Sequence, residues 1–67
     1  MNNSKLFPKD LILQKFPDAD LTIWYGKYWI EINSWGRLGG CDLISDAWEE
    51  AYQCLTSHGE FSLNINF

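Results

Sequence analysis

Apolar and polar side chains largely alternate over residues 21–32, which read LTIWYGKYWIEI. A period of two is typical of β-strands, because successive side chains point to opposite faces. Gly26 and Lys27 suit a two-residue type II′ turn, in which glycine supplies the positive φ of the first turn position. The stretch therefore predicts a β-hairpin that pairs Trp24 with Trp29.

The predicted hairpin has one face suited to a core and one face that carries two tryptophans. The core face consists of Leu21, Ile23, Tyr25, Tyr28, Ile30 and Ile32. The opposite face consists of Thr22, Trp24, Trp29 and Glu31. A one-residue slip of the register would exchange the two faces, so the assignment depends on the turn.

Two segments show helical signals. In residues 8–16, Pro8 suits the first helical position, and Pro17 ends the helix. In residues 46–57, Ser45 suits the N-cap and Gly59 the position after the C-cap. Apolar side chains of the second segment recur at the helical period, at Ala47, Trp48, Ala51, Tyr52 and Leu55.

The remaining segments predict a loop and two further strands. Residues 33–40 are rich in glycine and predict a loop, residues 41–44 predict a short third strand, and residues 61–67 alternate like a half-buried strand. The order is α-β-β-(β)-α-β, which predicts one compact α+β domain over residues 1–67, with an antiparallel sheet and a helix on one or both faces. Three arrangements are open: the first helix covers the tryptophan face in a three-layer sandwich, that face is an exposed aromatic platform, or the short helix covers only part of it and leaves one tryptophan partly exposed.

Composition adds eleven aromatic residues and an uneven charge. Large aromatic side chains compensate for the small core that 67 residues can bury. The net charge is −4, with a balance of +2 over residues 1–17 and −6 over residues 18–67. An acidic body argues against direct nucleic-acid binding, because phosphate contacts require Lys and Arg, and it favours a protein partner with a basic surface.

The sequence also bears on location. No apolar run approaches the ~20 residues of a membrane span. The first residues, MNNSKLFPKD, have no long apolar stretch of the kind found in a signal peptide. We therefore expect a cytoplasmic protein with reduced cysteines and no membrane partner.

Candidate catalytic and metal-binding groups are few. Cys41, Cys54 and His58 could supply three zinc ligands, but a structural zinc site needs four, and the usual close-spaced cysteine pair is absent. A Cys–His nucleophile pair or a pair of catalytic carboxylates needs a pocket, which a chain of this size barely forms. We expect no enzyme activity, no metal and no cofactor. The cysteine spacing leaves a disulfide undecided.

The sequence offers two candidate binding surfaces. The first joins the acidic start of the second helix to two residues of the glycine-rich loop, because carboxylates suit a basic partner and Trp and Arg are common interface anchors. Its residues are Trp35, Arg37, Asp42, Asp46, Glu49 and Glu50. The alternative is an aromatic platform of Trp24 and Trp29, on which sugars or unpaired bases would stack. An exposed edge strand at residues 64–67 would allow a homodimer.

The hairpin IWYGKYWIEI and the helix ISDAWEEAYQCL resemble those of small phage-encoded ABA-sandwich domains. The segments YWIEI, GGC and SDAWEEA are also similar to HicB-type antitoxin domains. Either resemblance implies a bacterial or phage origin and a binding role. The most specific expectation is a small acidic phage or mobile-element protein that inhibits a host nucleic-acid-binding protein in the host cytoplasm, as anti-defence (anti-CRISPR-like) inhibitors do.

Overall fold

The computed structural model describes residues 7–61, which form two helices and one sheet. The elements are α1 (Pro8–Lys15), β1 (Asp20–Trp24), β2 (Lys27–Ile32), β3 (Gly36–Cys41) and α2 (Ile44–Ser57). The three strands form an antiparallel sheet in the order β1-β2-β3. This confirms the predicted α+β class. The strand predicted at residues 61–67, and the homodimer edge with it, lie outside the described residues except for Phe61, which is in a turn.

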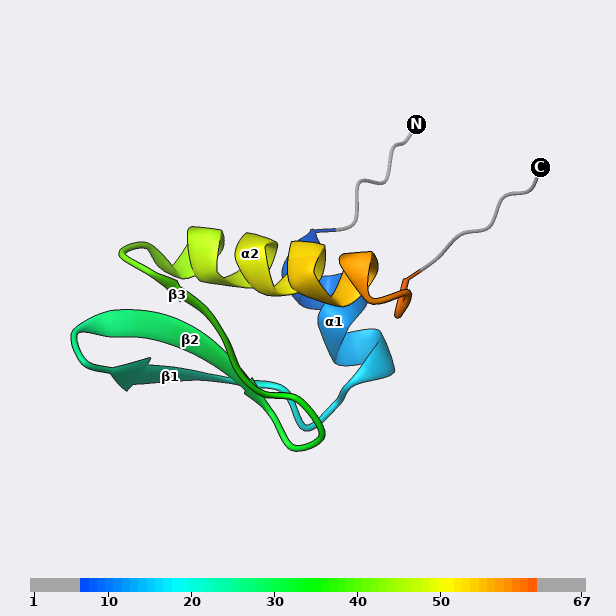
Figure 1. Cartoon of the computed structure of the whole chain (residues 1–67), viewed down its shortest axis with the longest axis horizontal. Helices are drawn as coiled ribbons and strands as arrows, with labels where there is room; N and C mark the ends of the chain where they lie inside the picture. Colours follow the sequence, from blue (N-terminus) through cyan, green and yellow to red (C-terminus); the bar gives the residue numbers. More distant parts are fainter. Residues whose placement is uncertain (1–6, 62–67) are drawn as a thin grey trace.

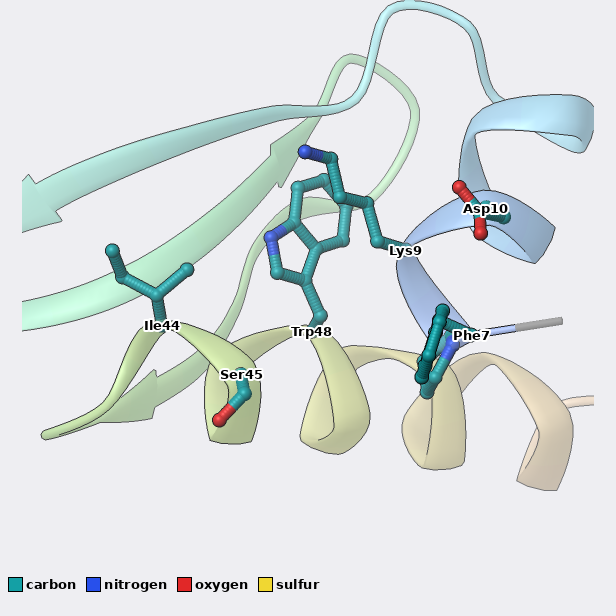
Figure 2. A pocket seen from close by; sticks show the side chains of 7 residues that line it. Phe7, Lys9, Asp10, Ile44, Ser45 and Trp48 are labelled. Atoms are coloured by element: carbon teal, nitrogen blue, oxygen red, sulfur yellow. The ribbon is translucent and has the colours of Figure 1, made fainter. Parts of the chain in front are cut away.

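Both helices lie on the same side of the sheet (Figure 1). The core consists mainly of the fully buried side chains of Ile12 on α1, Ile30 and Ile32 on β2, and Leu55 on α2. The three-layer sandwich is therefore wrong, because α1 packs beside α2 and contributes Ile12 to this core instead of covering the tryptophan face. Helix α2 contacts both the sheet and α1: its Trp48 side chain belongs to the core, and the Lys9 side chain of α1 extends beside the Trp48 ring (Figure 2).

The hairpin turn is one residue earlier than predicted. Tyr25 and Gly26 have φ angles of 54° and 73°, and two positive φ values are typical of a type I′ turn. Thr22 therefore pairs with Trp29, and Trp24 pairs with Lys27. The predicted type II′ turn and its pairing are wrong. The strand residues nevertheless lie on the predicted sides of the sheet, because moving the turn by one residue changes each cross-strand partner by two positions and leaves it on the same side. The predicted core face is wrong in part, since Ile23 is 67% exposed and Tyr25 lies in the turn and is 84% exposed.

The glycine-rich segment forms β3 from Gly36 onward, where a loop was predicted. Leu38 pairs with Ile30, and the register shifts at Gly40, which is the extra residue of a β-bulge. The glycines allow close packing on both faces of this strand. A Cβ atom on Gly39 would lie 3.1 Å from the Ala47 carbonyl oxygen of α2. The short strand predicted at residues 41–44 is accordingly wrong.

The limits of α2 agree with the prediction at one end only. The helix begins at Ile44, and its N-cap is Leu43, which makes no side-chain capping bond. The prediction of Ser45 as the N-cap is therefore wrong. At the other end, Gly59 has a φ of 87°, and the N–H groups of Gly59 and Glu60 donate to the carbonyl oxygens of Thr56 and Leu55. These two bonds form a Schellman motif, which confirms the predicted role of Gly59.

Candidate functional site

The sheet face opposite the helices carries two tryptophans and an arginine. The register places Trp24 of β1, Trp29 of β2 and Arg37 of β3 on this face, because Thr22 pairs with Trp29 and Glu31 pairs with Arg37. The predicted aromatic platform consisted of Trp24 and Trp29; from here on the name also includes Arg37. The exposed fraction of the Trp24 side chain is 43%, and Trp29 is half-buried.

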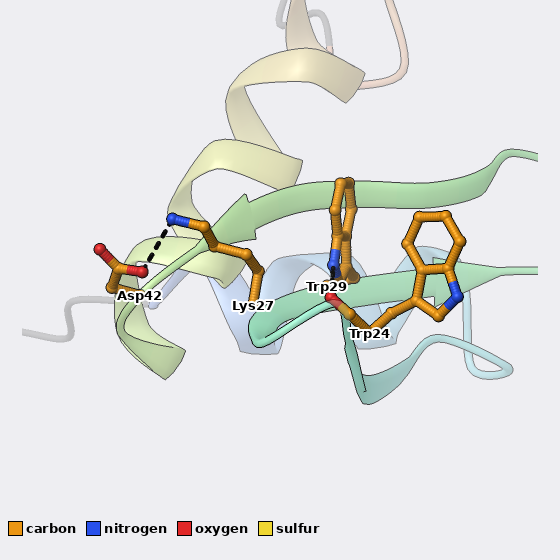
Figure 3. A network of polar contacts seen from close by, with 4 residues as sticks. All are labelled: Trp24, Lys27, Trp29 and Asp42. Carbon is orange, nitrogen blue, oxygen red and sulfur yellow. Dashed lines mark hydrogen bonds and ion pairs between the residues drawn. The ribbon is translucent and has the colours of Figure 1, made fainter.

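The members of the aromatic platform hold one another in place. The guanidinium carbon of Arg37 lies 4.4 Å from the centroid of the Trp24 ring, which is a close cation–π contact. The rings of Trp24 and Trp29 meet nearly edge to face, with centroids 5.8 Å apart. The indole N–H of Trp29 donates to the backbone oxygen of Trp24 at 2.9 Å (Figure 3). A ring fixed by such contacts loses little conformational freedom when a partner binds.

Trp29 also depends on the bulge in β3. A Cβ atom on Gly40 would lie 2.7 Å from Cη2 of the Trp29 ring. Any other residue at this position would force the ring away from the strand. The bulge therefore positions one member of the aromatic platform.

Tyr25 extends the exposed aromatic surface at the tip of the hairpin. Its side chain is 84% exposed, and its ring centroid lies 4.4 Å from that of Trp24. The left-handed backbone of Tyr25 costs a residue with a Cβ atom roughly 1–2 kcal/mol. An exposed tyrosine with a strained backbone buries little apolar area and so contributes little to the stability of the fold. This combination is typical of a residue that binds a partner.

The positive charges near the aromatic platform differ in their partners. The Lys27 ammonium lies 2.9 Å from the Asp42 carboxylate (Figure 3). The hydrogen bond to Asp42, together with its negative charge, raises the pKa of Lys27 above its usual value. Among residues 7–61, the other ion pair joins Lys15 to Glu60, and neither pair includes Arg37.

The predicted acidic residues form a cluster on α2, beside the end of β3. Asp46, Glu49 and Glu50 line a hollow of about 300 Å³ with Cys41 and Gln53. We call Asp46, Glu49 and Glu50 the acidic cluster. Desolvation, followed by the charges of Glu50, Asp46 and Asp42, raises the pKa of the Cys41 thiol. The thiol therefore keeps its proton at neutral pH, which makes it a poor nucleophile and a poor metal ligand.

The six residues predicted to bind a partner do not form one surface. The ring centroid of Trp35 lies 5.2 Å from that of His58, beyond the last turn of α2, whereas the acidic cluster lies near its first turn. Arg37 belongs to the aromatic platform on the other side of the sheet. Asp42 neutralises Lys27.

Sequence reasoning missed two residues of the site. Tyr25 was placed on the core face and Gly40 in a loop. The signal for Tyr25 was available, because Gly26 suits the second position of a type I′ turn as well as the first position of a type II′ turn. No sequence signal indicated that Gly40 lies against Trp29.

Residues 7–61 also contain the cysteines and the histidine considered as metal ligands or nucleophiles. They contain no group of three or more His, Cys, Asp or Glu side chains placed to hold a metal ion. Cys41 and Cys54 are free thiols. The His58 ring makes its hydrogen bond to the Cys54 backbone oxygen, at 2.9 Å. In this part of the chain, no helix is long and apolar enough to cross a membrane.

Comparisons with protein-family models, with curated proteins and with solved structures found no significant match to this chain. The resemblance to ABA-sandwich and HicB-type domains therefore stays a prediction from the sequence alone.

Proposed function

We propose that this chain is a non-catalytic protein-binding domain and that its partner docks on the aromatic platform. The observation that carries the proposal is the stack of Arg37 on Trp24, with Trp29 locked beside it, on a sheet face that neither helix covers. Trp, Tyr and Arg are the side chains that most often dominate the energy of protein interfaces. Exposed apolar surface with a polar rim is typical of such sites.

Charge supports a protein over a nucleic acid as the partner. The net charge of −4 opposes a polyanionic ligand. The acidic cluster favours a partner with a basic region, because opposite charges on the two proteins would also raise the rate of association. The most specific form of the proposal is a phage or mobile-element inhibitor that covers the basic surface of a host nucleic-acid-binding protein.

The second candidate is the stacking of a sugar ring or an unpaired base on Trp24 and Trp29. The exposure of Trp24 favours it, and each stacked base contributes roughly 1–3 kcal/mol. However, Arg37 already stacks on the Trp24 ring. A flat ligand on the ring face that Arg37 covers would have to displace the guanidinium group, whereas a protein partner can contact the two stacked groups together. The geometry therefore favours the protein.

The first prediction tests the aromatic platform directly. A partner is captured from the organism that carries the gene, purified, and titrated by calorimetry against wild type, Trp24→Ala, Arg37→Met and the double variant Glu49→Lys/Glu50→Lys. We expect Trp24→Ala and Arg37→Met each to weaken binding by about 30-fold, the effect of a hot-spot residue worth about 2 kcal/mol.

The controls separate the two surfaces. Lys15→Gln lies far from the aromatic platform and should bind like wild type. Circular dichroism must show that each variant is folded. Unchanged affinity of both platform variants would contradict the proposal, and loss of binding in the Glu49→Lys/Glu50→Lys variant alone would move the interface to the acidic cluster. Tight binding of an oligosaccharide or oligonucleotide that Trp24→Ala abolishes would favour the second candidate.

A further inference from the structure

A second hollow lies between the first turns of the two helices, on the side of the sheet that the aromatic platform does not reach. It has a volume of about 460 Å³, within the range of about 300–1,000 Å³ that is usual for small-molecule sites. Its lining is mostly apolar and includes Phe7 and Pro8 from the start of α1, with Ile44 and Trp48 from α2 (Figure 2). We call this hollow the helix-start groove.

The apolar lining of the helix-start groove is open to solvent. The side chains of Phe7 and Ile44 are 64% and 45% exposed. Trp48 is only 7% exposed and forms a fixed wall, because its buried part belongs to the core. A small apolar ligand would therefore cover two large exposed side chains without displacing the core.

One cationic side chain reaches into the helix-start groove. The Lys9 ammonium lies 5.8 Å from the centroid of the Trp48 ring (Figure 2). Among residues 7–61, no ion pair uses Lys9, whereas Lys15 on the same helix is paired with Glu60. Asp10 also borders the groove and makes no ion pair with Lys9. An apolar wall with an ammonium group that makes no ion pair within the described residues complements a ligand with an apolar body and one carboxylate.

We propose that the helix-start groove binds a small amphipathic carboxylate, with the apolar body on the exposed side chains of Phe7 and Ile44 and the carboxylate on the Lys9 ammonium group beside Trp48. The site is independent of the aromatic platform, so it holds whether or not a protein docks there. It gives the domain a second binding activity on the opposite side of the sheet.

The test uses decanoate as the probe, below its micelle concentration, and follows amide shifts in ¹H–¹⁵N spectra of the full chain. Decanol, which has the same chain length without the charge, serves as the ligand control. We expect saturable shifts at Lys9, Ile44, Ser45 and the Trp48 indole, and weaker binding of decanol.

Lys9→Gln should weaken decanoate binding about two- to fivefold, as for an exposed ion pair, and leave decanol binding unchanged. Asp10→Asn should tighten decanoate binding.

A matched pair of variants tests the location. Leu43 and Ile44 are neighbours with exposures of 59% and 45%, but only Ile44 lines the groove. Ile44→Glu should weaken decanoate binding at least tenfold, and Leu43→Glu should change it little. The proposal is overturned if decanoate shifts the Trp24 and Trp29 signals instead, if decanol binds as tightly as decanoate, or if Ile44→Glu and Leu43→Glu have the same effect.

Discussion

Gly40 is the residue on which the position of Trp29 depends. The ring of Trp29 lies so close to the Gly40 backbone that an added Cβ atom would be 2.7 Å from Cη2. The φ of Gly40 is 77°, a left-handed value that residues with a Cβ atom adopt at a cost. Gly36 has a similar φ of 89°, but an added Cβ atom there would meet no atom within 4 Å. The two glycines differ mainly in the contact with the ring.

The second prediction uses this difference. Gly36→Ala should destabilise the domain only through its backbone, by roughly 1–2 kcal/mol. Gly40→Ala should lower the free energy of unfolding by about 1–3 kcal/mol more than Gly36→Ala does, because the added methyl group forces the Trp29 ring away. Urea unfolding measures both losses, and the Trp29 indole proton in NMR spectra reports the bond to the Trp24 carbonyl. Equal losses in the two variants, with an unchanged indole signal, would show that Gly40 does not position the ring.

At the scale of the element, the hairpin turn has a sequence that does not favour its own conformation. Type I′ turns prefer Asn-Gly, because asparagine adopts the left-handed region readily. Here Tyr25 occupies the first turn position with a φ of 54° and an 84% exposed side chain. The turn therefore keeps an exposed aromatic ring beside Trp24 at the expense of stability.

The third prediction is that Tyr25→Asn stabilises the domain and weakens its function. Relief of the turn should add about 0.5–1 kcal/mol to the free energy of unfolding, which raises the melting temperature by about 2–8 °C in a domain of this size. Tyr25→Ala is the matched control, because it also removes the ring but keeps the strain. Both variants should bind the protein partner more weakly than wild type. A melting temperature that does not rise in Tyr25→Asn, or rises as much in Tyr25→Ala, would refute the argument.

The elements show how far the sequence determines this fold. The alternation over residues 21–32 assigned the strand residues to the correct sides of the sheet, although the turn was misplaced, because moving the turn by one residue does not change the side that a strand residue faces. It did not predict that Ile23 and Tyr25, both assigned to the core face, are 67% and 84% exposed. The same reasoning failed for β3, since its glycines resemble a loop in sequence, whereas backbone pairing of residues 36–39 with residues 29–32 of β2 makes this segment a strand. Arg37 was therefore predicted on a loop beside the acidic cluster and lies instead on the sheet face with Trp24.

The exposure of the tryptophans could not be predicted from the sequence. The apolar side of α1 could have packed on the tryptophan face of the sheet or beside α2, and its periodicity is the same in either arrangement. The choice depends on the shape of the core, where Ile12 fills a space among Ile30, Ile32 and Leu55. The sequence therefore predicted Trp24 and Trp29 as candidates and left their exposure open.

At the scale of the whole molecule, the position of both helices on one side separates three surfaces. The aromatic platform is on the open face of the sheet, the acidic cluster is beside the end of β3, and the helix-start groove lies between the helices. The tryptophans differ accordingly in exposure, from 43% for Trp24 to 7% for Trp48. Quenching of tryptophan fluorescence can therefore test the arrangement of the layers.

The fourth prediction is that Trp24 carries a large share of the quenching by iodide. Trp24→Phe should lower the accessible fraction of the fluorescence, whereas Trp48→Phe, if folded, should raise it, because it removes a protected fluorophore.

Iodide is an anion, so the acidic body repels it and Arg37 attracts it locally to the Trp24 ring. Neutral acrylamide, used in parallel, should quench Arg37→Gln at least as well as wild type, while iodide quenches this variant less. If Trp24→Phe leaves iodide quenching unchanged, the open face is covered in solution, and the aromatic platform cannot be the free docking surface proposed for the partner.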